Sequence, residues 1–174
     1  MNDAQKILIV DDEENIRRIF KKALGEKNYT VHTAKNAEDA LQKIKNQNYL
    51  LIFSDIFMDE MSGLTLLKEI KKIKPQAKIV VMTAQDTMNN TIEAMRTGAY
   101  DYISKPFDFE TVYALVDRVE ASREVQIPSR FEIEEEIDGH SVRSIIGKNK
   151  VMQNIFKTIG KSASSDLSVL ITGE

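Results

Sequence analysis

The chain has 174 residues, 42% of them hydrophobic and 29% charged, and a formal net charge of -3 at pH 7. Its length allows one packed domain of about 100–150 residues with a remainder. The slight negative charge supplies no basic field for nucleic acid, so we expect no direct nucleic-acid binding by this chain. The absence of cysteine excludes disulfides and thiolate chemistry.

The first residues and the hydropathy pattern argue against a membrane protein. Residues 1–6 contain no apolar core of a signal peptide. No apolar run approaches the roughly 20 residues that a membrane span needs. We therefore expect a cytoplasmic location and no membrane partner.

Five short segments are predicted to be β-strands. The second alternates apolar and polar residues, which is typical of a strand near a sheet edge. The third is a continuous apolar run that ends in a carboxylate, which favours burial on both faces. The five segments are Lys6–Val10, Thr30–Ala34, Leu50–Asp55, Lys78–Met82 and Tyr100–Ser104.

A helix is predicted after each strand, because apolar residues recur there every three or four positions. Asn36 and Asp108 are expected to cap the second and fifth helices. The last stripe can serve the core, a dimer or both, and the core is favoured. The stripes are Ile16, Ile19, Phe20, Ala23 and Leu24; Ala37, Ala40, Leu41 and Ile44; Leu64, Leu67, Ile70 and Ile73; Ile92, Ala94 and Met95; and Val112, Leu115, Val116 and Val119. Alternating strands and helices predict an α/β fold with a doubly wound, five-stranded parallel sheet.

Polar residues follow the strands, and a parallel sheet brings these ends to one edge. The first strand is followed by Asp11 and Asp12, and the third ends at Asp55. Three crowded carboxylates repel one another unless a cation joins them, and oxygen ligands favour a hard cation such as Mg²⁺. Thr83 adds a hydroxyl and Lys105 a positive charge. The set predicts phosphoryl transfer onto Asp55.

Each of these residues also has an ordinary structural interpretation. The acids from Asp11 to Glu14 could simply complement a helix dipole. Thr83 alone would be a cap or a strand-end hydroxyl, and Lys105 alone a solvated turn residue. Their joint placement at the strand ends favours the site.

The chain from about residue 6 to residue 123 resembles the receiver domain of bacterial two-component response regulators, which has a flavodoxin-like, CheY-like fold. The resemblance lies in the segments Ile7–Glu13, Ser54–Met58, Met61–Gly63, Thr83–Ala84 and Gly98–Phe107. It implies that a sensor histidine kinase phosphorylates Asp55. It also implies a cis bond between Lys105 and Pro106. The family commonly has proline where this chain has Asp59.

The resemblance further implies roles for individual residues. Mg²⁺ would be held by Asp12, Asp55 and the backbone carbonyl of Phe57, with Asp11 as an outer partner of the metal. Thr83 and Lys105 would contact the phosphoryl group. Tyr102 would act with Thr83 as the switch.

The last part of the chain has a second, shorter resemblance. Residues 144–174 are similar to the opening of the AAA+ ATPase domain of sigma-54-dependent activators of the nitrogen-regulator class. They stop at Gly173, the first glycine of a phosphate-binding loop, so we expect no ATPase activity from this chain. We expect a receiver with a C-terminal linker helix over 1–123, a linker over 124–143, and an incomplete AAA+ domain over 144–174. The full-length protein would then have an AAA+ domain, sigma-54 RNA polymerase as partner, and a homodimer through the receiver and linker helix.

Three other functions compete with the phospho-acceptor. A haloacid-dehalogenase-like phosphatase wants a second aspartate two residues after the first, where this chain has Phe57. A flavin site needs a phosphate-cradling loop after the first strand, where this chain has four acids. A phosphorylation-independent interaction or dimerisation module remains as the alternative, and a phosphorylation test separates it from the switch.

Overall fold

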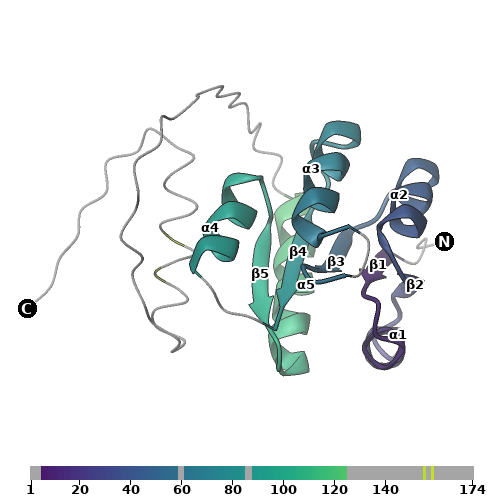
Figure 1. The fold of residues 1–174 in the computed structure, drawn as a ribbon. Coiled ribbons are helices and arrows are strands. Elements are labelled where there is room, and N and C mark those ends of the chain that lie inside the picture. Colours follow the sequence, from purple (N-terminus) through teal and green to yellow (C-terminus); the bar gives the residue numbers. More distant parts are fainter. Residues whose placement is uncertain (1–4, 59–60, 85–87, 125–154, 156–157, 159–174) are drawn as a thin grey trace, which may run out of the picture.

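The computed structural model describes residues 5–58, 61–84 and 88–124, together with Ile155 and Thr158. Within these ranges the chain alternates strands and helices, as the sequence predicts (Figure 1). The elements are β1 (Lys6–Val10), α1 (Glu14–Gly25), β2 (Thr30–Ala34), α2 (Ala37–Asn46), β3 (Leu51–Asp55), α3 (Gly63–Ile73), β4 (Ile79–Thr83), α4 (Met88–Arg96), β5 (Asp101–Ser104) and α5 (Phe109–Glu124). The predicted linker beyond Glu124, the AAA+ segment apart from those two residues, and Asp59 lie outside the described residues.

The five strands form one parallel sheet in the order β2-β1-β3-β4-β5. The alternating strand β2 lies at an edge, and the fully buried β3 lies in the centre, as predicted. The α/β, doubly wound fold is therefore confirmed. No helix in the described ranges is long and apolar enough to cross a membrane.

Helices cover both faces of the sheet and create two core layers. Buried residues of α2, α3 and α4 pack with Leu8 and Val10 on one face. Buried residues of α1 and α5 pack with Ile7 and Ile9 on the other face. Successive residues of β1 thus serve opposite layers, as the two-residue period of a strand requires.

Local signals at the helix ends act as the sequence predicts. The side chain of Asn36 accepts a hydrogen bond from the Asp39 N–H (3.0 Å), and that of Asp108 accepts one from the Thr111 N–H (2.7 Å). Both side chains satisfy a donor that the first turn of a helix leaves without a partner. After α4, Gly98 takes φ +94°, a conformation that glycine adopts at no steric cost.

The helix stripes are only partly correct. Ile19 and Ile73, both predicted to face the core, are 50% and 41% exposed. On α4, Thr91 is buried beside Ala94 and Met95, while Ile92 is only partly covered. The rotation of each helix on the sheet thus leaves residues at the margin of the predicted stripe at the surface, and on α4 it buries a threonine that lies outside the stripe.

The stripe on α5 belongs to the core. Its four residues are at most 2% exposed and pack in the layer that α5 shares with α1.

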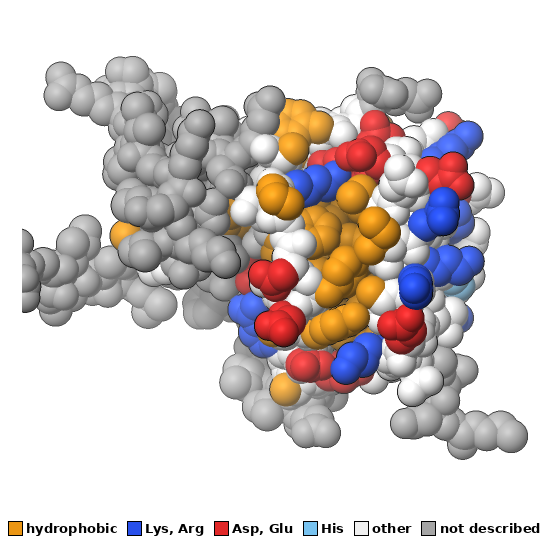
Figure 2. All heavy atoms as spheres, turned by 90° about the horizontal axis from the view of Figure 1, so that it is seen from below, with side chains coloured by type: hydrophobic (Ala, Val, Ile, Leu, Met, Phe, Trp, Pro, Cys, Tyr) orange, Lys and Arg blue, Asp and Glu red, His pale blue; other side chains and the backbone are white. Residues whose placement is uncertain are grey.

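Viewed from below, where α1 and the lower end of α5 lie in Figure 1, apolar side chains gather in the middle of the surface with charged side chains around them (Figure 2).

Two neighbouring residues on α1 provide a direct test of the helix rotation. Phe20 is fully buried, and its ring centroid lies 5.2 Å from that of Phe53 and 5.4 Å from that of Phe107. Phe20→Ala should lower the free energy of unfolding by about 3–5 kcal/mol, because it leaves a cavity. Ile19→Ala should cost less than about 1 kcal/mol, because the side chain is half exposed. Urea unfolding of both variants measures the difference, and equal losses would contradict the observed rotation.

Candidate functional site

The candidate site lies at the carboxyl ends of β1 and β3. The sheet order reverses between these strands, which is where doubly wound sheets open a crevice. Val10 pairs with Ser54 in the register of the two strands, so the residues that follow, Asp11 and Asp55, leave the sheet at the same level. Asp11 is fully buried, Asp55 is 4% exposed, and Asp12 is exposed to solvent.

The three carboxylates predicted from the sequence come together. One oxygen from each of Asp11, Asp12 and Asp55 lies within 4.8 Å of the other two. A set made of carboxylate oxygens alone suits a hard cation, and Mg²⁺ binds through one or two carboxylates while keeping several waters. The buried pair beside an exposed third ligand fits that requirement, because the exposed side leaves room for water.

Lys105 joins the two buried carboxylates. Its Nζ donates to Oδ2 of Asp55 (2.7 Å) and to Oδ2 of Asp11 (2.8 Å), and it lies 3.6 Å from Oε1 of Glu13. The side chain is 12% exposed, so it is not the solvated turn residue of the ordinary interpretation. The expected cis bond between Lys105 and Pro106 is present.

Burial and the close contacts between these charged groups shift the pKa values of Asp11 and Lys105. Burial raises the pKa of Asp11 above its usual value, although the hydrogen bond from Lys105 acts in the opposite direction. Burial alone would lower the pKa of Lys105, but its hydrogen bonds to Asp11 and Asp55 outweigh burial and raise it. Lys105 therefore stays protonated at neutral pH and holds a positive charge between the two carboxylates.

The same two carboxylates are also fixed by backbone donors. Oδ1 of Asp11 accepts from the Glu13 N–H (2.9 Å), and Oδ1 of Asp55 accepts from the Phe57 N–H (3.2 Å). In each case one oxygen faces the residue two positions on and the other faces Lys105, so the orientation of both carboxylates is set. The side chain of Phe57 is 45% exposed beside Asp55. That its carbonyl is a metal ligand stays a prediction.

Thr83 lies on β4 and Tyr102 on β5, the two strands that follow β3 in the sheet. Thr83 ends β4 and is 1% exposed, and its carbonyl accepts from the Lys105 N–H (2.7 Å). Tyr102, on β5, is 2% exposed and packs in the same core layer as Ala94 and Met95 of α4. Thr83 thus lies next to Lys105 of the carboxylate site, and Tyr102 lies in the core layer that contains α4. Their predicted role as a switch stays a prediction.

Two further residues shape the site, although neither was predicted to take part in it. Gly63 begins α3, and a Cβ atom there would lie 1.9 Å from the carbonyl oxygen of Asp55. No side chain fits at that distance, so glycine is required for α3 to approach the end of β3. The Ser62–Gly63 pair signals only a turn in the sequence. The second residue is Arg17, which the periodicity of α1 assigns to solvent but which the structure partly buries.

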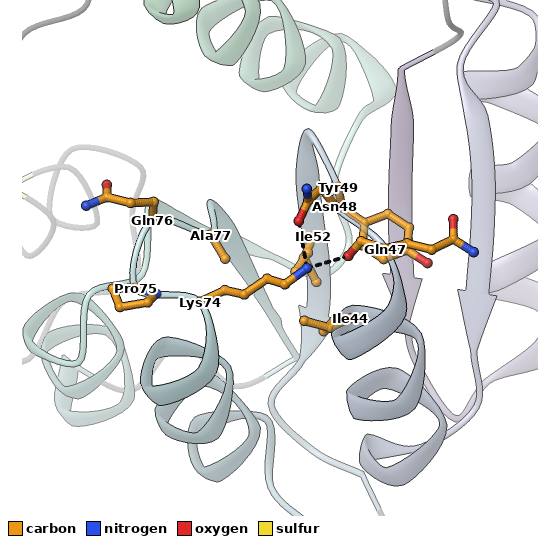
Figure 3. Close-up of a pocket in the computed structure, with 9 residues that line it drawn as sticks. All are labelled: Ile44, Gln47, Asn48, Tyr49, Ile52, Lys74, Pro75, Gln76 and Ala77. Atoms are coloured by element: carbon orange, nitrogen blue, oxygen red, sulfur yellow. Dashed lines mark hydrogen bonds between the residues drawn. The ribbon is translucent and has the colours of Figure 1, made fainter.

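The hollow in Figure 3 lies elsewhere, at the amino ends of the central strands. It has a volume of about 470 Å³. Its lining residues are Ile44, Gln47, Asn48, Tyr49, Ile52, Lys74, Pro75, Gln76 and Ala77. Lys74 reaches across it and donates to the carbonyl of Gln47 (2.7 Å) and to Oδ1 of Asn48 (2.7 Å). The ammonium of Lys74 is thus hydrogen-bonded to two neutral oxygens, and the hollow shares no residue with the carboxylate site.

Comparison with known proteins agrees with this geometry. The DNA-binding transcriptional regulator NtrC of Escherichia coli strain K12 is 34% identical over 169 residues, which are 97% of this chain and 35% of that protein. The chain thus spans about a third of the length of that curated relative.

Many solved structures are similar to the described fold, and two of them are given as examples. Response regulator protein TrrA from Thermotoga maritima, determined in complex with Mg²⁺ and BeF, is 38% identical with a TM-score of 0.61. The match covers 66% of this chain and 98% of TrrA. The beryllofluoride-activated NtrC4 receiver domain, determined as a dimer, is 29% identical with a TM-score of 0.64, covering 67% of this chain and 97% of that one.

The family model of the response regulator receiver domain matches residues 7–117. That range begins at the second residue of β1 and ends inside α5, so it includes four complete strands, the rest of β1, and every residue of the carboxylate site. The fold, the strand-end acids and the bridging lysine thus agree with the match, and the chain belongs to the response regulator receiver domain family.

Proposed function

We propose that Asp55 accepts a phosphoryl group and that this chain is the phosphorylation switch of a longer transcription regulator. The observation that carries the proposal is the contact of Lys105 with both Asp55 (2.7 Å) and Asp11 (2.8 Å) in a cluster of three carboxylates. Three carboxylates this close together repel one another, so the cluster destabilises the fold unless a cation offsets the repulsion. Phosphoryl transfer onto Asp55 would use its carboxylate as the nucleophile, the neighbouring carboxylates to hold a divalent cation, and Lys105 to contact a phosphoryl oxygen.

The proposed reaction forms one bond and breaks one. An oxygen of the Asp55 carboxylate attacks the phosphorus of a phosphohistidine or an acyl phosphate, and the bond from phosphorus to the donor breaks. Lys105 stays protonated and can turn from Asp55 to an oxygen of the transferred group. Mg²⁺ bound by Asp12, Asp55 and the Phe57 carbonyl, beside Asp11, would neutralise charge on the phosphoryl oxygens. The acceptor remains an aspartyl phosphate, so the chain acts as a switch with self-phosphorylation chemistry.

The readout would run through Thr83 and Tyr102. Thr83 stands at the end of β4, where its hydroxyl would contact the new phosphoryl group. Tyr102 packs against residues of α4, so a change in its packing would alter the surface that α4 and β5 present. A phosphorylation switch needs an element with two alternative conformations, and Tyr102 would provide it through its packing against α4.

The remaining partners follow from the relatives. We propose a sensor histidine kinase as donor, a cytoplasmic location, and a homodimer through the receiver and the linker helix. The dimer of the NtrC4 receiver domain supports the last point. The match to NtrC extends over 97% of the chain and supports a linker over 124–143 and the start of an AAA+ domain over 144–174. In the full-length protein that domain would act on sigma-54 RNA polymerase.

Intact-mass measurement tests the acceptor chemistry. The chain is incubated with acetyl phosphate in Mg²⁺ and, separately, after chelation of divalent ions. We expect one phosphoryl group per chain with Mg²⁺ and none without it. No gain in Mg²⁺, with the protein folded and Mg²⁺ bound, would favour the phosphorylation-independent interaction module.

A further inference from the structure

Arg17 folds back from α1 onto the loop that carries two of the site aspartates. Its Nη1 donates to the carbonyl oxygen of Asp11 (2.6 Å) and to that of Asp12 (2.7 Å). A terminal guanidinium nitrogen has two hydrogens, so each carbonyl takes one. Its neighbour Arg18 is exposed, as expected of a charged residue on the outer side of a helix.

The loop needs a partner of this kind because it precedes the helix. The hydrogen bond from the Arg17 N–H to the Glu13 carbonyl (3.3 Å) belongs to the first turn of α1. The carbonyls of Asp11 and Asp12 come before that turn and have no helical donor. Besides the contacts of Lys105 with side chains of the loop, two hydrogen bonds engage its backbone donors, from the Asp11 N–H to the Ala34 carbonyl (3.2 Å) and from the Glu13 N–H to Oδ1 of Asp11 (2.9 Å). The second of these bonds fixes the peptide group between Asp12 and Glu13 from its N–H side, and Arg17 holds the carbonyl side of the same group.

The carboxylate of Asp12 depends on this backbone contact. Asp12 is exposed, and no hydrogen bond from a described residue to its carboxylate is present in the structure. The loop backbone therefore sets the point from which this carboxylate extends. If the carbonyls of Asp11 and Asp12 were released, they would also offer oxygen ligands to a cation and change the geometry of the site.

We propose that Arg17 is a positioning residue for the divalent-cation site: it holds the carbonyls of Asp11 and Asp12 and so fixes the backbone from which the exposed Asp12 carboxylate approaches Asp11 and Asp55. The proposal rests on the proposed function, since it concerns the same cation. Groups that orient metal ligands without touching the metal commonly contribute 10- to 100-fold in affinity, and the same range is expected here.

The sign of the effect separates positioning from simple electrostatics. A guanidinium near the site repels a divalent cation, so charge alone predicts that Arg17→Met binds Mg²⁺ more tightly than the unchanged chain. Positioning predicts the reverse, about 10-fold weaker binding. Arg18→Met removes the same charge one residue away and should change the affinity less than about twofold, because exposed charges are screened.

The experiment is a calorimetric titration of each folded variant with Mg²⁺, without any phosphoryl donor. Circular dichroism first establishes that each variant is folded. Arg17→Lys, which keeps the charge and a donor on a flexible stem, should recover part of the affinity lost in Arg17→Met. Affinity in Arg17→Met equal to or tighter than that of the unchanged chain would overturn the proposal.

A second comparison covers a failure of Arg17→Met to fold. Arg17→Lys should then bind Mg²⁺ about threefold more weakly than Arg18→Lys, because an ammonium lacks the fixed fork of the guanidinium. Equal affinities would overturn the proposal. If the unchanged chain binds no Mg²⁺, the proposed function itself fails, whereas Mg²⁺ binding that is insensitive to Arg17 rejects only the role of this residue.

Discussion

Asp55→Asn should take up no phosphoryl group under conditions in which the unchanged chain takes up one. An amide is neutral and has no carboxylate oxygen to attack phosphorus, so the loss should be complete rather than partial. The replacement has nearly the same shape, and its single amide oxygen can still accept one of the two hydrogen bonds that the carboxylate accepts, from the Lys105 ammonium or from the Phe57 N–H. The fold should therefore persist, because Asp55 lies in a well-supported strand end with all of β3 buried.

The measurement is intact mass after incubation with acetyl phosphate and Mg²⁺, with circular dichroism to establish folding. Asp39→Asn is a matched control, because it removes a carboxylate from α2 that pairs only with the partly exposed Lys43 among the described cations. That control should gain one phosphoryl group. A gain that survives in Asp55→Asn would reassign the acceptor, with buried Asp11 and exposed Asp12 as the carboxylates to examine by peptide mapping.

The gathering of the residues at the strand ends could be predicted, because their positions depend on the topology of the sheet more than on side-chain packing. Once five buried strands alternate with helices, parallel pairing sends Asp11, Asp55 and Lys105 to one edge, whatever the details of the core. The contacts of Lys105 with both aspartates have this origin. The caps at Asn36 and Asp108 were predictable for a local reason, since the side chain bonds the backbone three residues on.

The rotation of each helix was less accessible, because it depends on which side chains fill the space beneath it. Ile19 and Phe20 are equally good members of the apolar stripe, and in the structure it is Phe20 that packs against the rings of the core. Those rings belong to Phe53, Phe107 and Phe109. Ile73, in the last turn of α3, stays 41% exposed. Periodicity identifies a face of a helix but does not fix it to within one residue.

Arg17 and Gly63 were missed for opposite reasons. An arginine on a helix is solvent-facing by default, and only the tertiary position of the carbonyls of Asp11 and Asp12 gives it a partner. Gly63 belongs to the segment Met61–Gly63 of the resemblance, but its close approach to the Asp55 carbonyl depends on how α3 lies against β3. Both residues support the site through the backbone, and sequence motifs record side-chain chemistry more readily than backbone geometry.

Lys105→Met should slow phosphoryl uptake by about 100- to 1000-fold, the usual loss when one fixed donor to a developing negative charge is removed. Methionine keeps most of the length of the side chain, so the change isolates the ammonium group. The initial rate of mass gain, at saturating acetyl phosphate and Mg²⁺, measures the effect. Lys72→Met is the matched control, because Lys72 is 72% exposed and pairs only with Glu69 among described residues, and its rate should not change.

The same variant should also reveal the second role of Lys105. Without its ammonium, the buried Asp11 and Asp55 face each other with no shared cation, and the free energy of unfolding in chelator should fall by about 3 kcal/mol. Mg²⁺ should then stabilise Lys105→Met more than it stabilises the unchanged chain, because the cation binds the folded state and takes over the neutralising charge. An unchanged uptake rate together with lost stability would make Lys105 a structural link between β5 and the two aspartates. A slower rate, measured with Mg²⁺ saturating and the fold intact, would place it in the transfer step.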